Sequence, residues 1–204
     1  MKIGKTVLAI TLISIFACNS KVNQSSEQIK EIENEIQQLK TANAKKIYLE
    51  KILEDDQAVR DSEKSAELML KYGKDSEEYM EYVKTQWKQD EINLIKVEKY
   101  LEIYGYPGKE LGDMATTTPW MVIHHAQGYE TRERNFEKVY GAYLKGDIDD
   151  GAISFYLGRM YQMKNGERLR MESPFKAEDE INQLIKELNL EEKKANAQQS
   201  VKRS

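Results

Sequence analysis

The two histidines of the chain are adjacent, His124 and His125, at the end of an apolar run that starts at Trp120. Successive residues of a helix point about 100° apart, so the two rings cannot close on one metal ion without distorting the backbone. No second histidine lies four residues away, which excludes a pair of zinc ligands on one helix. We therefore expect no metal and no cofactor, with one of the two rings facing the core.

His125 has two interpretations that the sequence leaves open. It is either a buried histidine hydrogen-bonded to a helix or to Asp56, or a general base. Asp56 and Arg60 lie four residues apart and can pair on one helix face, which adds only about 0.2–0.5 kcal/mol if the pair is exposed. If the pair is partly buried, its guanidinium can tie helices together or bind a carboxylate or phosphate. No nucleophile motif, phosphate-binding loop or pair of cysteines is present.

The beginning of the chain reads as an export signal. Lys2 and Lys5 precede an apolar run over residues 6–16, which is too short to cross a membrane as a helix and fits the apolar region of a secretory signal. The run ends Ile15-Phe16-Ala17-Cys18, which resembles the lipobox of bacterial lipoproteins. Alternatives are a signal peptide with an incidental cysteine and an uncleaved anchor.

The lipobox resemblance implies that residues 1–17 are a cleaved signal peptide and that Cys18 carries a diacylglycerol thioether. The new amino terminus would then be acylated, with palmitate as a measurable label. Several acyl chains hold a protein stably at a membrane, whereas one chain holds it weakly. Asn19 after the cysteine implies the outer membrane by the enterobacterial sorting rule, and either face of the membrane remains open. We expect a lipid-anchored protein of the bacterial cell envelope.

The chain after Cys18 is expected to be all-α. Residues 18–28 are polar and are expected to form a flexible tether. A long amphipathic first helix is then expected over residues 29–56, because apolar residues repeat at helical spacing. This stripe begins with Ile29, Ile32, Ile36 and Leu39. It either packs on its own domain or forms a homodimer seam.

Helix start and stop signals predict the rest of an irregular multi-helix bundle, one domain over residues 29–195. Helices are expected over residues 62–72 and from Ser76 to Gly105. A short helix is expected from Pro119 to Gln127 with Thr118 as its N-cap, because proline favours the first helical position. Further helices are expected over residues 131–144, from Asp149 to Gly166, and over residues 178–195, followed by a frayed polar tail over residues 196–204.

Four short motifs together resemble an uncharacterised bacterial helical domain family found in lipoproteins and secreted proteins. Its members read roughly DQxxR, YGxP, an apolar run ending QHA, and YLxDR. The matching pieces here are Asp56-Gln57-x-x-Arg60, Tyr104-Gly105-Tyr106-Pro107, the run from Trp120 to His125-Ala126, and Tyr156-Leu157-x-Arg159. The resemblance covers about residues 49–190. The family has no established reaction, so the resemblance implies a domain and no mechanism.

The departures from this pattern bear on any site that the family has. His124 stands where the family has Gln, and Gly158 stands where it has Asp. The segment 168–173 lacks the family's Gln and Tyr-Gly-Thr-Gln signature. The positions that match, and that become candidate site residues through the resemblance, are Asp56, Gln57, Arg60, His125 and Arg159.

Two functions from different classes follow. The first is a non-enzymatic envelope protein that binds an unknown envelope protein or a small ligand, with Gln57, Arg60 and Arg159 as binding residues. The second is an envelope hydrolase or lyase that uses His125 with Asp56, Arg60 and Arg159, and it requires these side chains to meet in one cleft. The net charge of −4 over 204 residues argues against a nucleic-acid partner, which needs a basic face.

Overall fold

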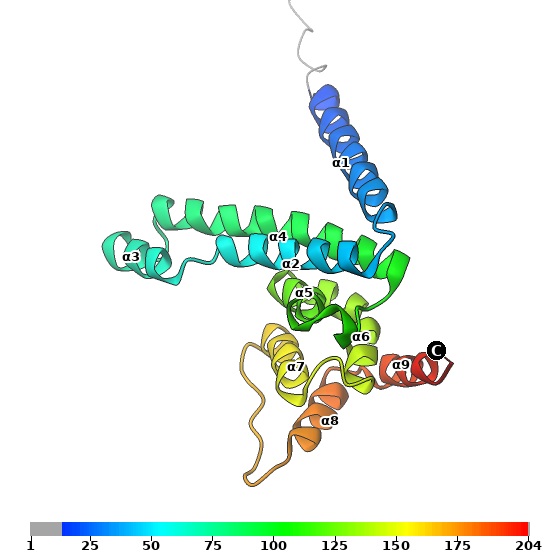
Figure 1. The fold of residues 1–204 in the computed structure, drawn as a ribbon. Coiled ribbons are helices and arrows are strands. Elements are labelled where there is room, and N and C mark those ends of the chain that lie inside the picture. The colour runs from blue at the N-terminus through cyan, green and yellow to red at the C-terminus, as the bar shows by residue number, and fades with distance from the viewer. Residues whose placement is uncertain (1–13, 204) are drawn as a thin grey trace, which may run out of the picture.

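The computed structural model describes the backbone of residues 14–203 and the side chains of residues 26–203, and this part of the chain is all helical (Figure 1). The helices are α1 (Ser14–Gln37), α2 (Ala42–Ala58), α3 (Ser62–Tyr72), α4 (Glu77–Tyr104), the 3₁₀ turn η1 (Lys109–Leu111), α5 (Asp113–His125), α6 (Tyr129–Leu144), α7 (Asp150–Asn165), α8 (Ala177–Glu187) and α9 (Glu191–Arg203). The all-α fold class expected from the sequence is therefore confirmed for the described residues.

Helix α5 is the centre of the bundle, because it contacts α2, α4, α6 and α7 (Figure 1). Helices α2 and α4 lie side by side above it, and α6 and α7 continue the bundle below, with α8 and α9 packed on them. The core follows this axis, with Leu49, Val97, Val122, Phe136 and Leu157 all fully buried. Helix α3, at the far end of the α2–α4 pair, buries none of its side chains.

Several helix ends lie where the sequence signals place them. Ser76 caps α4 by accepting a hydrogen bond from the Tyr79 amide, and Asp149 caps α7 by accepting one from Ala152. These side-chain oxygens satisfy amides that have no partner inside the helix. Gly105 ends α4 and Gly166 ends α7 with positive φ, a conformation that favours glycine.

The long first helix expected over residues 29–56 is two helices, with a break after Gln37. The apolar stripe weakens at Asn43 and Lys46, so a straight helix would turn polar residues toward the core. The chain instead turns, and the Thr41 hydroxyl caps α2 by accepting a hydrogen bond from Ala44. On the other side of the break, the Tyr104 hydroxyl lies 2.9 Å from the carbonyl oxygen of Ile36 and ties α1 to α4.

The apolar stripe that could form a homodimer seam packs largely against the same chain. Ile32 and Ile36 are buried, and α1 packs on α4. Ile29 and Leu39 stay half-buried at its two ends. The packing of this helix on its own domain is therefore observed, and a homodimer through Ile29, Ile32, Ile36 and Leu39 stays a prediction.

The helix expected from Pro119 begins six residues earlier, and Thr118 is not its N-cap. Helix α5 starts at Asp113, and Pro119 lies inside it. A proline inside a helix removes one hydrogen bond and costs about 3 kcal/mol. Burial of the helix against α2 offsets that cost, since Thr118, Pro119 and Val122 are all buried. The Thr118 hydroxyl donates to the carbonyl oxygen of Leu49 on α2, or to that of Met114 on its own helix, at 3.0 and 2.8 Å.

The last helix expected over residues 178–195 is also divided, and the tail expected to fray over residues 196–204 is helical to Arg203. Leu188 and Leu190 are both buried, and a continuous helix would turn one of them away from the core. Asn189, with a φ of 58°, makes the turn between them. The tail belongs to α9, which packs on α6 with Ala197 buried.

The signal peptide expected over residues 1–17 and the lipidation site Cys18 lie outside the residues whose side chains are described, so both stay predictions. The segment 18–28, expected as a tether, is part of α1. Its Glu, Gln and Lys residues are good helix formers, so a polar composition does not oppose a helix. Among the described helices, none combines the length and the apolar character needed to span a membrane.

Candidate functional site

An ionic network joins the ends of α2 and α5 to the middle of α4. Asp56 lies in the last turn of α2, Arg60 lies two residues beyond that helix, His125 is the last residue of α5, and Asp90 lies on α4. The Arg60 guanidinium lies between the two carboxylates, 3.3 Å from Asp56 Oδ1 and 2.5 Å from Asp90 Oδ1. The Gln57 amide donates to Asp56 Oδ2 at 2.8 Å. The network is therefore a junction of three helices.

His125 enters this network through Nδ1. That atom lies 2.9 Å from Asp56 Oδ2, and Arg60 Nε donates to it at 3.0 Å. A ring nitrogen serves only one of these partners at a time. If Nδ1 carries the hydrogen, it donates to Asp56 and a neutral ring has a free lone pair at Nε2. If Nδ1 accepts from Arg60, Nε2 carries the hydrogen and is a donor.

Burial differs across the network. The Asp56 side chain is fully buried, whereas the His125 side chain is 22% exposed. Burial raises the pKa of the Asp90 carboxyl, and the hydrogen bond and charge of Arg60 oppose that shift. His125 and Arg60, with 22% and 19% of their side chains exposed, therefore combine a buried carboxylate partner with access to solvent.

A second group of charges lies on the other side of His125, in a pocket of about 280 Å³. Its lining includes both histidines and three arginines, Arg132, Arg159 and Arg168, and no Asp or Glu. The whole chain carries a net charge of −4, so this cluster of cations is opposite in sign to the net charge of the protein. We call it the arginine pocket.

Arg132 is the buried member of the arginine pocket, with 2% of its surface exposed. Its guanidinium donates to the carbonyl oxygen of His124, in the last turn of α5, and to that of Gly128, which precedes α6. These carbonyls and the negative end of the α5 dipole stabilise part of its charge. Nε has no hydrogen-bond partner, and among the described residues no carboxylate forms an ion pair with it. Burial lowers the pKa of Arg132 to about 10, so the group stays cationic at neutral pH.

His124 forms one wall of the arginine pocket. It is 7% exposed, its ring stacks on Phe155 at 4.3 Å between centroids, and Trp120 meets it edge-on. Burial, followed by the charge of Arg132, lowers the pKa of His124 to about 3, so the ring is neutral at physiological pH. Its buried Nδ1 has no hydrogen-bond partner. The ring therefore contributes shape and a free polar atom but no charge.

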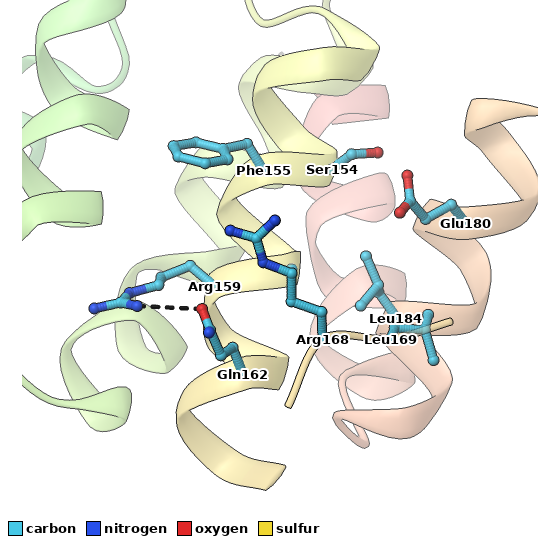
Figure 2. Close-up of a pocket in the computed structure, with 9 residues that line it drawn as sticks. Ser154, Phe155, Arg159, Gln162, Arg168, Leu169, Glu180 and Leu184 are labelled. Atoms are coloured by element: carbon cyan, nitrogen blue, oxygen red, sulfur yellow. Dashed lines mark hydrogen bonds between the residues drawn. The ribbon is translucent and has the colours of Figure 1, made fainter. Parts of the chain in front are cut away.

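Arg159 does not join Asp56 and Arg60, although the sequence grouped them. It projects from α7 and donates to the Gln162 side chain at 3.2 Å (Figure 2). It lines the arginine pocket together with His125, so the two share a cavity without a hydrogen bond. Of the four side chains that a hydrolase was expected to bring together, Asp56, Arg60 and His125 are in hydrogen-bond contact and Arg159 is not.

A further pocket of about 300 Å³ adjoins the arginine pocket between α7 and α8 (Figure 2). The two pockets share Phe155, Arg159, Gln162 and Arg168. Figure 2 shows Arg168 extending along α7 toward Phe155, with Leu169 and Leu184 close together beside it. We call this second cavity the α7–α8 pocket.

The network contains metal-ligating residue types, but Arg60 lies among them. Among the described residues, no group of three or more His, Cys, Asp or Glu side chains is arranged to hold a metal ion. A cation between Asp56 and Asp90 would have to displace the guanidinium that both of them contact. The chemistry of this site is therefore that of its own charges and of His125.

Sequence reasoning missed Asp90, Arg132 and Arg168. Asp90 interrupts an apolar stripe on α4 that runs Val83, Trp87, Leu94, Val97 and Leu101, and a charge at a stripe position indicates a buried ion. Arg132 has the same signal on α6, four residues before Phe136. Arg168 lies in a loop and carries no periodic signal.

Comparisons with protein-family models, curated proteins and solved structures found no significant match. The resemblance to the helical domain family therefore stays a prediction.

Proposed function

We propose that the protein binds a small anionic ligand, a carboxylate or phosphate group, in the arginine pocket. The observation that carries this proposal is the charge of the lining, with three arginines and no carboxylate. Cations in a partly enclosed pocket repel one another, and an anion relieves that repulsion. The neighbouring Arg60 shows the contrast, because two buried carboxylates already contact its guanidinium.

The three arginines suit different parts of such a site. Arg159 and Arg168 are exposed, so they can meet a ligand from solvent. A planar guanidinium presents paired donors that match the oxygens of a carboxylate or phosphate. Arg132 is held at the base by two carbonyl oxygens, and its charge acts on the ligand without further ordering.

His125 adds a donor in one of its two tautomers. When Arg60 Nε donates to Nδ1, the hydrogen of the neutral ring is on Nε2, at the opposite edge from the network. A ligand anion in the pocket favours this tautomer, because it provides an acceptor for Nε2–H. Anion binding is therefore expected to shift the hydrogen bond of Nδ1 from Asp56 to Arg60.

Isothermal titration of the purified chain with inorganic phosphate and with acetate tests the proposal. Replacing Arg159 and Arg168 together by Gln is expected to weaken binding at least about tenfold, the loss of one charge-assisted hydrogen bond or more. Arg134→Gln is the matched control, because Arg134 contacts Glu98 outside the pocket. Equal weakening in the control, or no saturable binding of either anion by the wild type, would contradict the proposal.

Hydrolysis of an anionic ester is a second candidate, favoured by the 2.9 Å contact between Asp56 and His125. In the tautomer with hydrogen on Nδ1, the Nε2 lone pair takes a proton from water. The hydroxide attacks the phosphorus or carbonyl carbon of the bound ester, and the leaving alcohol receives the proton. The competing contact from Arg60 to Nδ1 opposes this tautomer, which is why binding is the first candidate.

Release of p-nitrophenol from p-nitrophenyl phosphate distinguishes the two candidates. General-base catalysis contributes about 10²–10⁴-fold, so His125→Gln is expected to lose turnover on that scale. Glutamine retains a donor, so phosphate binding is expected to survive in the same variant. No turnover by the wild type would contradict the hydrolase and leave the binding function in place.

We also propose that the protein is a lipoprotein of the outer membrane, attached through Cys18. The resemblance of Ile15-Phe16-Ala17-Cys18 to a lipobox supports the lipid anchor, and Asn19 supports the outer membrane. Metabolic labelling with palmitate is expected in the wild type and not in Cys18→Ser. Labelling that persists in the variant would contradict the anchor.

A further inference from the structure

The α7–α8 pocket differs in chemistry from the arginine pocket that it adjoins. Its walls are Phe155, Leu169 and Leu184, with Arg159 and Arg168 at the boundary between the two pockets (Figure 2). Phe155 is more than half exposed. An exposed aromatic side chain beside a hollow with apolar walls is typical of a small-molecule site.

Glycine at position 158 keeps this pocket open. Gly158 lies inside α7 and lines the pocket, and a Cβ atom built on it would meet no other atom within 4 Å. A glycine inside a helix costs about 0.8–1.0 kcal/mol relative to alanine, and packing does not require one here. The residue therefore leaves empty a space that a side chain would otherwise occupy.

The polar groups at the pocket's rim are unevenly charged. Arg159 and Arg168 lie on the side shared with the arginine pocket, and Glu180 lies on the α8 wall. In the described part of the chain, Glu180 makes no ion pair with Arg168. An anionic group is therefore attracted to the shared side and repelled from the far side, which fixes the direction of a ligand that has one charged end.

We infer that the ligand is a single-chain anionic amphiphile, with its carboxylate or phosphate between Arg159 and Arg168 and its aliphatic chain in the α7–α8 pocket. The inference rests on the proposed function for the anionic end. A cavity of about 300 Å³ suits one short chain, at the lower end of the range for small-molecule sites. The chain contacts Phe155, Leu169 and Leu184, and Gly158 forms the floor.

Titration with methyl, butyl, hexyl and octyl phosphate, each below its micelle concentration, tests this assignment. Burial of one methylene is worth about 0.8 kcal/mol, so affinity is expected to rise two- to fourfold for each added methylene until the pocket is full. Gly158→Leu fills the pocket and is expected to remove the chain-length dependence while methyl phosphate still binds. Gly158→Ala leaves most of the space and retains most of the dependence.

A control variant excludes binding at other apolar surfaces. Leu70 on α3 is 89% exposed, and Leu70→Ser is expected to leave the series unchanged. An affinity independent of chain length in the wild type, or an undiminished dependence in Gly158→Leu, would overturn the inference. Failure of methyl phosphate to bind the wild type would instead overturn the proposed function.

Vesicles that contain dioleoyl phosphatidic acid test a membrane lipid as the source of the same chemistry. We expect their binding to be equal in wild type and Gly158→Leu, because a two-chain lipid exceeds the pocket. Binding that Gly158→Leu abolishes would place a membrane lipid in the pocket and overturn the single-chain assignment.

Discussion

The ionic network around Asp56 and the arginine pocket meet at His125, and they differ in whether their cations have carboxylate partners. In the network, Arg60 lies between two buried carboxylates that are both within 3.3 Å of it. In the pocket, Arg132, Arg159 and Arg168 share a lining without any carboxylate. The carboxylates that pair with Arg60 belong to the chain, whereas the cations of the pocket gain a counter-charge only when an anion enters from outside.

This difference separates structural ions from functional ones. A buried pair whose partners are all present adds little net stability but is costly to break, because the remaining partner stays buried. Exposed cations without a carboxylate partner are nearly neutral for stability, so their removal is expected to change binding instead. His125 belongs to both groups, so a ligand bound in the pocket is expected to change the hydrogen bonds of the network.

The largest expected effect is on stability, from breaking the network. Asp56→Asn removes the fully buried charge that contacts Arg60 and His125, and we expect a loss of about 3 kcal/mol. For a chain of this length the melting temperature falls by about 6–12 °C. Asp55→Asn is the matched control, because Asp55 pairs with the exposed Lys51 and its loss is expected to cost under about 0.5 kcal/mol. Similar melting temperatures for the two variants would mean that the network is not a structural junction.

The next effect concerns the pH dependence of stability, from His124. The folded-state pKa of about 3 lies below the usual value of 6.5, so the unfolded chain binds the proton more tightly. Stability from this residue is complete above about pH 6.5 and is lost as the pH falls toward 3. Between pH 7 and pH 5 the loss is about 2 kcal/mol, and His124→Phe, which keeps a ring against Phe155, is expected to reduce the loss by that amount. Chemical denaturation at both pH values measures it, and an equal loss in wild type and variant would place the ring in solvent.

A smaller effect separates binding from stability in the arginine pocket. Arg159→Gln alone is expected to weaken phosphate binding about tenfold while changing the free energy of unfolding by less than about 0.5 kcal/mol. Calorimetric titration and chemical denaturation of one preparation give both numbers. A loss of stability larger than the loss of binding energy would assign Arg159 to the fold.

The smallest expected effect is a gain. Gly158→Ala replaces a glycine inside α7, and its methyl group enters open space. Helix propensity predicts up to about 1 kcal/mol of stabilisation. Gly141→Ala on α6 is the comparison, because the added Cβ would lie 3.8 Å from a Val201 side-chain atom instead of entering open space. A destabilised Gly158→Ala would mean that the space beside Gly158 is not open.

The sequence allowed prediction of elements with clear end signals, such as α4 between Ser76 and Gly105, and of the contact between Asp56 and His125 as one of two interpretations. It did not allow prediction of where α5 begins, because burial of Thr118 and Pro119 against α2 overrides the preference of proline for a helix start. The break in the last helix was missed for a similar reason, since it is set by which leucines reach the core.

The candidate site was predictable where its members lie near one another in sequence and not where they meet only in space. Asp56 and Arg60 are four residues apart, so their pairing follows from helix geometry. Arg132 and Arg168 come from α6 and from a loop, and only the packing of α5, α6 and α7 brings them to one pocket. Buried charges at stripe positions were the usable signal for Asp90 and Arg132.

The two histidines make a direct measurement possible, because both line the arginine pocket and the sequence has no others. Nitrogen-15 NMR of untagged, histidine-labelled protein gives four ring-nitrogen signals to follow as phosphate is added. We expect the His125 signals to shift saturably, with hydrogen moving from Nδ1 to Nε2, and this shift to be lost when Arg159 and Arg168 are both replaced by Gln. Histidine signals that do not move at any phosphate concentration up to about 10 mM would contradict an anion site in this pocket.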